Sequence, residues 1–153
     1  MFGAQHPLQQ KIPAMRVEPY LMFFGRCEEA LAFYQRAIDA KLQTLMRFKD
    51  NPEPPRMPLP AGWDDKVMHS GFMVGDTLVM ASDGMSDQPQ RSDSVTLSIT
   101  ADDEAQARRV FDALADGGSV FMPLGKTFWS PCFGMCSDRF GVSWMVGVDA
   151  PPA

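Results

Sequence analysis

The stretch KVMHSGFMVGDTLVMASD, residues 66–83, predicts two β-strands that meet at a turn formed by Gly75 and Asp76. Short apolar runs joined by a glycine-containing pair of turn residues are typical of a β-hairpin. A second stretch, FGMCSDRFGVSWMVG at residues 133–147, predicts another hairpin with its turn at residues 138–141. Two late hairpins of this kind indicate that one structural unit occurs twice.

The residues before each hairpin follow the same order in both halves. Apolar residues at helical spacing and acidic first turns indicate one helix in each half, and Gly117-Gly118 marks the C-terminal end of the second helix. The expected strand, helix and strand are residues 19–25, 27–40 and 41–49 in the first half, and residues 94–100, 102–118 and 119–129 in the second. The predicted fold class is therefore α+β, with two βαβββ modules. We expect their sheets to pair into a half-open, barrel-like arrangement with the helices outside and a cleft inside.

The sequence divides into four parts. Residues 1–14 are polar and interrupted by proline, which suggests a flexible arm; extra sequence upstream of a natural start at Met15 is equally compatible. The first module is expected at residues 15–84 and the second at residues 94–149, with a linker at residues 85–93. Both modules are expected to form one globular domain.

Composition excludes several classes of partner. The 153 residues are 45% hydrophobic and 22% charged, with a net charge of −5 and no cluster of lysine and arginine. This balance argues against nucleic acid or an anionic membrane as the partner, because both require a concentrated cationic face. The sequence lacks an apolar run long enough for a membrane span or a signal peptide, and its three cysteines do not form a disulfide framework. We therefore expect a soluble cytoplasmic protein.

Four stretches point to a known family. They are PYLMFFGRCEEALAFYQ, VMHSGFMVGDTLVMASD, DDEAQARRVFDALADGG and MPLGKTFWSPCFGMCSDRFGVSW, and in order they span nearly all of residues 17–147. The chain resembles the vicinal oxygen chelate superfamily, which includes glyoxalase I, extradiol dioxygenases and bleomycin resistance proteins, and it is most similar to the PhnB-like group. Members of that group are often labelled demethylubiquinone methyltransferases. The sequence does not support that label, because no glycine-rich nucleotide-binding turn follows a strand and opens a helix.

The resemblance also implies where a metal ion would bind. Metal enzymes of the superfamily carry a glutamate in the last strand, but Met145 stands at that position here. A thioether is a poor ligand for hard divalent ions. The strands at residues 76–83 and 94–100 carry no histidine or glutamate, and only Glu18 lies near the first strand. We expect no metal site and no required cofactor; the alternative is a divalent ion such as Zn, Ni, Mn or Fe.

Five residues are candidates for binding a ligand. Thr96 and Ser98 lie on the hydroxyl-bearing face of an alternating strand, and we expect Met145 to face the same cleft. Trp129 precedes a proline-containing loop and either lines the mouth of the cleft or caps the end of the sheet. His69 is the only histidine inside the predicted fold, so it is a candidate polar anchor or general base. A half-buried, hydrogen-bonded histidine is the alternative.

Other residues have simpler interpretations. Trp144 shares a strand face with Val142 and Val146 and is expected in the core. Cys132 and Cys136 would need His69 and the distant Cys27 to complete a zinc site, so buried thiols are the alternative reading. Asp83 fits a turn cap better than a catalytic acid. Many methionines fall on the predicted strands: Met22, Met46, Met68, Met73, Met80, Met122, Met135 and Met145. They either fill the core or line an apolar pocket that accepts ligands of irregular shape.

These observations favour a small-molecule-binding protein with an apolar cleft and no required metal. Its long edge strands need cover, so we expect a homodimer. The alternative is a lyase or isomerase of the superfamily that uses His69, together with Glu18 or Asp83, as acid/base groups or as metal ligands.

Overall fold

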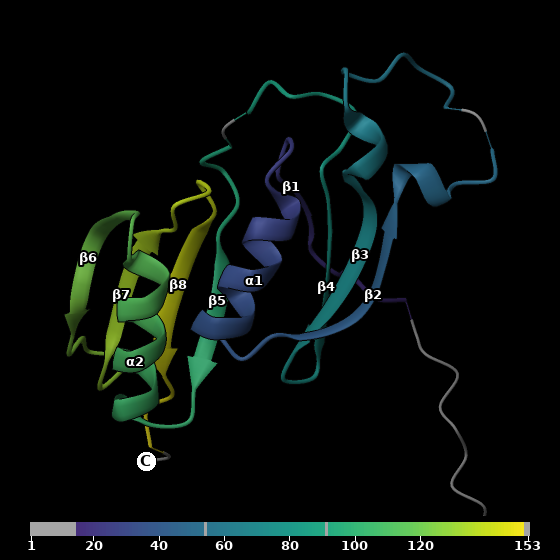
Figure 1. The fold of residues 1–153 in the computed structure, drawn as a ribbon. Helices are drawn as coiled ribbons and strands as arrows, with labels where there is room; N and C mark the ends of the chain where they lie inside the picture. The colour runs from purple at the N-terminus through teal and green to yellow at the C-terminus, as the bar shows by residue number, and fades with distance from the viewer. Residues whose placement is uncertain (1–14, 54, 91, 152–153) are drawn as a thin grey trace, which may run out of the picture.

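The computed structural model describes residues 15–53, 55–90 and 92–151 (Figure 1). The predicted arm at residues 1–14 lies outside them. The elements are β1 (Tyr20–Met22), α1 (Cys27–Ala37), β2 (Lys41–Arg47), two short 3₁₀ helices (Phe48–Asp50 and Trp63–Asp65), β3 (Val67–Val74), β4 (Thr77–Ser82), β5 (Leu97–Ala101), α2 (Glu104–Ala115), β6 (Ser119–Gly125), β7 (Phe133–Ser137) and β8 (Ser143–Val148). Within the described residues, neither helix is long and apolar enough to cross a bilayer.

The strands form two four-stranded mixed sheets with the same topology. The N-terminal sheet has the order β1-β4-β3-β2, and the C-terminal sheet has the order β5-β8-β7-β6. In each, the first strand of the half pairs in parallel with the last strand, while the other pairs are antiparallel. The structure thus confirms the α+β fold of two βαβββ units that the repeated element order predicted.

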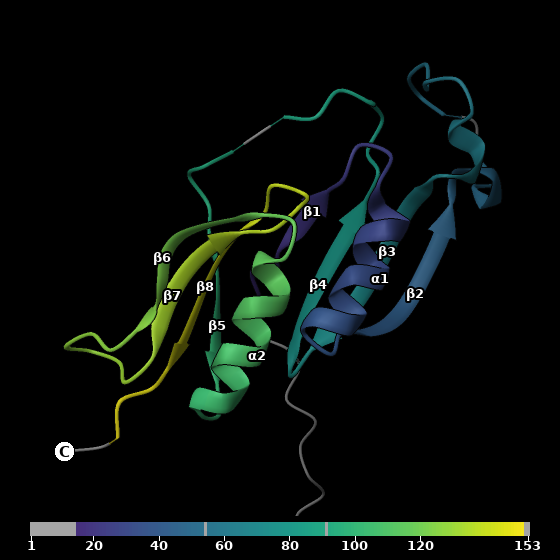
Figure 2. The same ribbon diagram turned by 60° about the vertical axis from the view of Figure 1, so that its left-hand side comes forward.

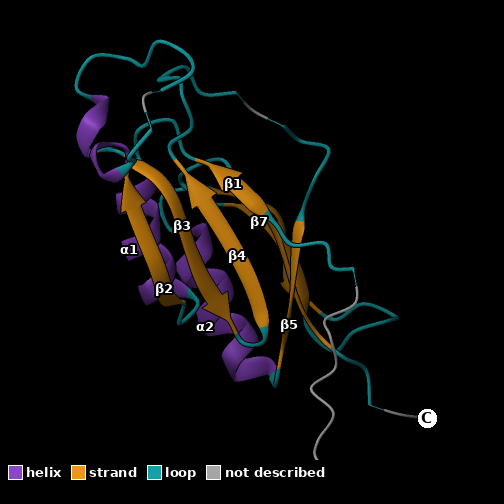
Figure 3. Cartoon of the chain, turned by 90° about the vertical axis from the view of Figure 1, so that its right-hand side faces the viewer, coloured by secondary structure: helices purple, strands orange, loops and turns teal. Residues whose placement is uncertain are grey.

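Both helices lie on the same side of the two sheets (Figures 2 and 3). Within the residues that the structure describes, the opposite side of each sheet has no helix over it, and we call these two surfaces the open faces of the N-terminal and C-terminal sheets. Alternation along the strands assigns side chains to one side or the other. In β8, for example, Trp144 and Val146 are buried on the helix side, so Met145 belongs to the open face.

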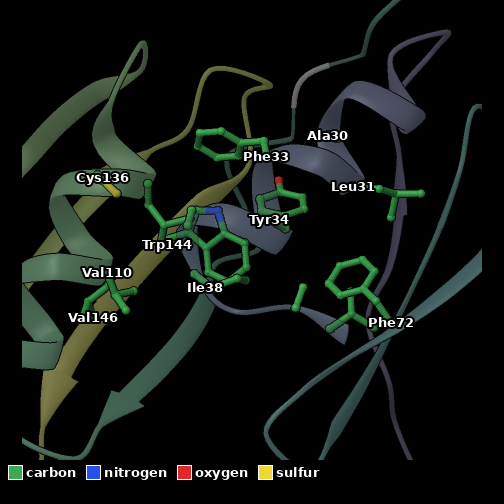
Figure 4. Packing of buried hydrophobic residues seen from close by; sticks show 14 of the residues in the cluster. Ala30, Leu31, Phe33, Tyr34, Ile38, Phe72, Val110, Cys136, Trp144 and Val146 are labelled. Carbon is green, nitrogen blue, oxygen red and sulfur yellow. The ribbon is translucent and has the colours of Figure 1, made fainter. Parts of the chain in front are cut away.

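The two halves share one hydrophobic core, which passes through Tyr34 of α1 (Figure 4). The Tyr34 ring stacks on Phe72 of β3 with 5.9 Å between centroids, and it meets Trp144 of β8 edge-on at 5.7 Å. Tyr34 is completely buried, and Trp144 is 3% exposed. Aromatic contacts of this kind add to the stability gained from burial alone. The expectation that Trp144 lies in the core is therefore confirmed.

The helices begin with different caps. Asp103 caps α2 locally, since its carboxylate accepts a 2.8 Å hydrogen bond from the backbone N–H of Gln106. Helix α1 has no side-chain cap of its own, and Asp83, just after β4, takes that role. Asp83 is 1% exposed and accepts 2.8 Å hydrogen bonds from the N–H groups of Gly25, Cys27 and Val67. This carboxylate holds the start of α1 against the N-terminal sheet.

The four strands with predicted bounds are all shorter in the structure: residues 19–25 contain only Tyr20–Met22, and residues 41–49 contain Lys41–Arg47. The strand expected at residues 94–100 begins at Leu97, because its first paired residue is Leu97 opposite Trp144. The strand expected at residues 119–129 ends at Gly125. Its Pro123 is tolerated because β6 is an edge strand, in which a missing N–H need not interrupt a ladder on both sides.

Candidate functional site

A row of three methionines crosses the open face of the C-terminal sheet. Met122 of β6 lies opposite Met135 of β7, and Met135 lies opposite Met145 of β8. On the far side of Met145, β5 places Ser98 directly opposite it. Side chains that face one another across paired strands are close neighbours. Two residues singled out from the sequence, Ser98 and Met145, are therefore adjacent on one face.

A β-bulge in β6 brings Met122 into this row. Val120 pairs with Cys136, so regular pairing would place Phe121 opposite Met135 and turn Met122 to the helix side. Instead the register shifts, and Met122 takes the position opposite Met135. Bulges of this type re-aim a side chain and are frequent beside functional sites. The sequence pattern assigned Met122 to a strand but could not show which face it occupies.

Aromatic rings border the methionine row on one side. Phe133 pairs with Gly147, where an added Cβ would come within 3.1 Å of the Phe133 ring, so this glycine leaves room for the ring. Trp129 packs against Phe133 with 5.4 Å between centroids, and Phe128 packs against Trp129 at 4.8 Å. Trp129 is 47% exposed. It therefore lies at the rim of this face, with one part packed on the sheet end and another part accessible.

Hydroxyl groups border the row on the other side. Ser119, Ser137 and Ser143 are paired across β6, β7 and β8 in the next row of the same face. Thr96 lies just before β5 and is half-buried, while Ser98 in β5 is exposed. The open face of the C-terminal sheet thus combines an apolar centre, hydroxyls and an aromatic edge.

His69 belongs to the other sheet. It lies on β3 opposite Met46 of β2, and its Nδ1 is hydrogen-bonded to the hydroxyl of Tyr20 on β1 at 3.0 Å. The two rings are 5.7 Å apart between centroids. Burial raises the pKa of Tyr20, so the phenol stays protonated near neutral pH. The structure therefore places His69 on the open face of the N-terminal sheet, not beside Ser98, Met145 and Trp129 of the same chain.

A cavity of about 820 Å³ lies between the two halves next to β5. The β3–β4 turn, the end of α1, strand β5 and the start of α2 surround it. Thr96 and Ser98 contribute to its wall, together with apolar side chains such as Val79 and Ile99. Among the residues that the structure describes, those that line the cavity do not include Met145, Trp129 or His69. Ser98 and Thr96 therefore lie where this cavity borders the C-terminal sheet, and the other candidates do not.

The remaining polar candidates have structural partners. The Asp83 carboxylate is used by three backbone N–H groups at the start of α1 and of β3. Glu18 lies 3.6 Å from Arg16. Neither of these two carboxylates forms a hydrogen bond or ion pair with His69, whose hydrogen-bond partner is Tyr20. The pairing of His69 with Glu18 or Asp83, as the alternative function would require, is not present in this arrangement.

The three cysteines are buried and free. Burial, with a contribution from the Asp83 carboxylate, raises the pKa of the Cys27 thiol to about 12. Burial and the nearby Asp138 raise the pKa of the Cys136 thiol to about 11. Thiols of this kind are poor nucleophiles and poor metal ligands at neutral pH, since the thiolate is the reactive form. Among the described residues, no three histidine, cysteine, aspartate or glutamate side chains are grouped as an ion would require.

Comparison with known proteins identifies the family. A family model described as 3-demethylubiquinone-9 3-methyltransferase matches residues 15–147. The chain belongs to this family. The chain is 43% identical to protein PA1353 from Pseudomonas aeruginosa, whose crystal structure matches it with a TM-score of 0.78; the match covers 89% of this chain and 98% of that one. The PhnB protein from Bacillus cereus is 27% identical, with 88% and 99% coverage and a TM-score of 0.72.

A more distant structure shares the fold alone. The glyoxylase/bleomycin resistance protein/dioxygenase domain from Frankia sp. EAN1pec is 9% identical over 92% of this chain and 96% of that one, with a TM-score of 0.61. These matches confirm the resemblance and the fold class inferred from the sequence. The family description names a methyl transfer, but α1 follows the Phe23–Arg26 turn and α2 follows Asp102-Asp103, so neither described helix opens on a glycine-rich nucleotide-binding loop.

The donor set on the open face does not fit a hard divalent ion. Met145, in the position that the family resemblance assigns to a glutamate, has Met135 and Ser98 as its partners on the neighbouring strands. Hard divalent ions require several oxygen or imidazole ligands, and thioethers do not substitute for these ligands. The metal chemistry of the superfamily is therefore not assigned to these residues.

Proposed function

We propose that the chain is a small-molecule-binding protein of the PhnB-like glyoxalase/bleomycin-resistance class. Its ligand lies on the open face of the C-terminal sheet and requires no metal. The observation that carries this proposal is the row of Met122, Met135 and Met145 in direct cross-strand register. Unbranched thioether side chains adapt to the shape of an apolar ligand, and few other side chains do so as readily.

The borders of the row supply the other properties of a ligand site. Small-molecule sites are mainly apolar, with a few polar groups that fix the orientation of the ligand. Ser98 offers a hydroxyl beside Met145, and Trp129 offers an aromatic surface at the rim. We expect an aromatic or apolar ligand that carries a hydrogen-bonding group and stacks on Trp129.

A homodimer is part of the proposal. Large apolar side chains are exposed on the open faces or at the edges of both sheets: Tyr20, Met22, Met46, Phe121, Met122, Phe128 and Trp129. Apolar surface of this extent on strands is typical of an interaction surface, and edge strands β2 and β6 are unpaired on their outer sides in the described chain. A second copy covers these surfaces and narrows the ligand face into a cleft. Free buried thiols are compatible with a reducing compartment, so we place the protein in the cytoplasm.

Tryptophan fluorescence tests the ligand site. Titration with 4-nitrophenol, which combines an aromatic ring with a hydroxyl, should quench the emission of the wild-type protein in a saturable manner. Trp129→Ala should remove most of this quenching, whereas Trp63→Phe should retain it, because Trp63 is buried and donates to the carbonyl of Gly84 in the N-terminal half. Equal quenching in the wild type and in Trp129→Ala would contradict the proposed position of the ligand.

One observation favours a second candidate function. The hydrogen bond between Tyr20 and His69 fixes an imidazole on the open face of the N-terminal sheet, and this pair could transfer a proton in an acid/base reaction. The enzyme would then be a lyase or isomerase of the superfamily. Elemental analysis of protein purified without chelator separates the two candidates: stoichiometric Zn, Ni, Mn or Fe that is lost in His69→Gln would favour the enzyme.

A further inference from the structure

We propose that Met122, Met135 and Met145 form a thioether site for a soft monovalent cation, Cu(I), on the open face of the C-terminal sheet. The site shares its face with the proposed organic ligand but does not rest on the binding of that ligand. It concerns a different class of ion from the divalent metals of the superfamily.

The register of three strands aligns the three methionines so that their side chains can reach one ion. Adjacent strands in a sheet are about 4.8 Å apart, and directly opposed side chains have Cβ atoms about 5 Å apart. Met135 is central, with Met122 on one side and Met145 on the other. Methionine has an unbranched side chain with three rotatable bonds. The two outer side chains can therefore lean over Met135 and share an ion with it.

The backbone itself departs from regular pairing to complete this set. Without the bulge at Phe121, Met122 would face the helix side and only two methionines would remain in the row. The extra residue at the bulge is Phe121, which is 61% accessible. Bulges re-aim side chains and are frequent beside functional sites, so the alignment of a third thioether by this bulge supports a functional role for the row.

The donor chemistry selects the ion. Thioether sulfur is a soft ligand that favours Cu(I), whereas carboxylate, carbonyl and water favour hard ions. The row and its immediate neighbours offer three thioethers and serine hydroxyls, with no carboxylate or imidazole among the paired residues. The aromatic face of Trp129, packed on Phe133 beside the row, adds a surface that attracts cations. Because Cu(I) carries a single positive charge, neutral thioether ligands can bind it without an anionic ligand.

The cysteines are the chief competitors for a soft ion. All three are buried, at 0% exposure for Cys27 and Cys136 and 3% for Cys132. Burial raises the pKa of Cys27 to about 12 and that of Cys136 to about 11, so their thiolates are scarce at neutral pH. In the methionine row, Met122 is 39% exposed and Met135 and Met145 are half-buried, and thioethers need no deprotonation to bind an ion. We therefore expect it to bind a soft ion before the thiols do.

A titration with silver nitrate tests the site, since Ag(I) is a soft monovalent ion that does not change oxidation state in air. The protein is labelled with ¹³C at the methionine methyl groups, and Leu substitutions assign the three signals. One equivalent of Ag(I) should shift the methyl signals of Met122, Met135 and Met145 together. Met135→Leu should weaken Ag(I) binding by about tenfold or more, since even loss of an outer partner of a metal ligand costs about 10–100-fold. Met73→Leu, a control on the N-terminal sheet, should leave the affinity unchanged.

The outcomes separate this site from the organic ligand site. Met135→Leu conserves volume and apolar character, so its free energy of unfolding should stay close to that of the wild type and a loss of Ag(I) binding would not reflect misfolding. Loss of Ag(I) binding in a folded Met135→Leu protein would support the thioether site, and wild-type protein that binds Ag(I) but not 4-nitrophenol would show that this site exists without the organic ligand site. Silver shifts that spare these three methyl groups, or that persist unchanged in Met135→Leu, would overturn it, as would uptake of Ag(I) at the cysteines alone.

Discussion

The hydroxyl of Tyr34 donates a 2.5 Å hydrogen bond to Oδ2 of Asp138, which joins α1 in the N-terminal half to the β7–β8 turn in the C-terminal half. The same oxygen accepts the indole N–H of Trp144 at 2.9 Å. The other oxygen, Oδ1, accepts the backbone N–H groups of Phe140 and Val142 at 2.9 and 3.1 Å. Asp138 is only 3% exposed, so this buried carboxylate is held by four donors from both halves. Its position links the core to the turn that leads into the strand of Met145.

Replacement of Asp138 should strongly destabilise the fold. Asp138→Ala leaves four donors without their acceptor, two of them on buried side chains, and we expect a loss of about 3–5 kcal/mol in the free energy of unfolding. Urea unfolding followed by circular dichroism measures the change. Asp116→Ala is a matched control, because that carboxylate pairs with Arg139 but its side chain is 78% exposed, so the loss should be below about 1 kcal/mol. Equal losses for the two variants would contradict this role of Asp138.

Tyr34 should make the fold sensitive to alkaline pH. Burial, followed by the charge of Asp138, raises the pKa of Tyr34 in the folded protein. Above about pH 10 the unfolded chain releases this proton while the folded chain keeps it, so the free energy of unfolding falls as pH rises, by up to about 1.4 kcal/mol per pH unit. Tyr34→Phe should flatten this decrease between about pH 10 and 11. Tyr20→Phe should change it less, since Tyr20 is 42% exposed, and an unchanged slope in Tyr34→Phe would refute the account.

The two C-terminal tryptophans should have separate phenotypes. Trp144→Ala creates a cavity in the shared core and removes a donor to Asp138, so it should lower the free energy of unfolding by roughly 3–5 kcal/mol. Trp129→Ala should leave folding nearly unchanged and weaken aromatic ligands by about 1–3 kcal/mol, because Trp129 is at the rim. Thermal unfolding and ligand titration of both variants make the comparison. The reverse pattern would mean that the strand faces are assigned wrongly.

Assembly gives a further prediction. Light scattering at micromolar concentration should give a mass about twice that of the 17.0 kDa chain. Met46→Lys, which places a charge on the open face of the N-terminal sheet, should shift the population toward the monomer. Lys41→Glu changes charge on an exposed residue of the same strand and should have a smaller effect. A mass of 17.0 kDa for the wild-type protein would refute the dimer.

The sequence predicted the repeated architecture because each element carries its own periodic pattern, and the structure agrees. Alternation placed Met145 and Trp144 on opposite faces, and the ligand position implied by the family resemblance then indicated that Met145 shares a face with Ser98 and that Trp144 lies in the core, as the structure shows. It could not reveal the contribution of Met122, because a one-residue bulge reverses the face of every later side chain. Features that depend on contacts between distant residues were equally inaccessible to local patterns.

Two such features are the remote cap and the buried loop tryptophan. Asp83 follows a strand in sequence but caps a helix that begins 56 residues earlier. Trp63 lies at the end of a proline-rich loop that predicts no regular element, yet it is 5% exposed and donates a 2.8 Å hydrogen bond to the carbonyl of Gly84. The pairing of Tyr20 with His69 likewise depends on the neighbouring positions of β1, β4 and β3 in the N-terminal sheet.

The most direct test of the central claim is a methyl NMR titration of ¹³C-methionine-labelled protein with 4-nitrophenol, in the absence of added metal and in the presence of EDTA. We expect concerted, saturable shifts of the Met122, Met135 and Met145 methyl signals, with no shift for Met57 and Met85, which are exposed outside the two sheets. Saturable binding that leaves those three signals unmoved, or binding that EDTA abolishes, would contradict a metal-independent ligand site on the open face of the C-terminal sheet.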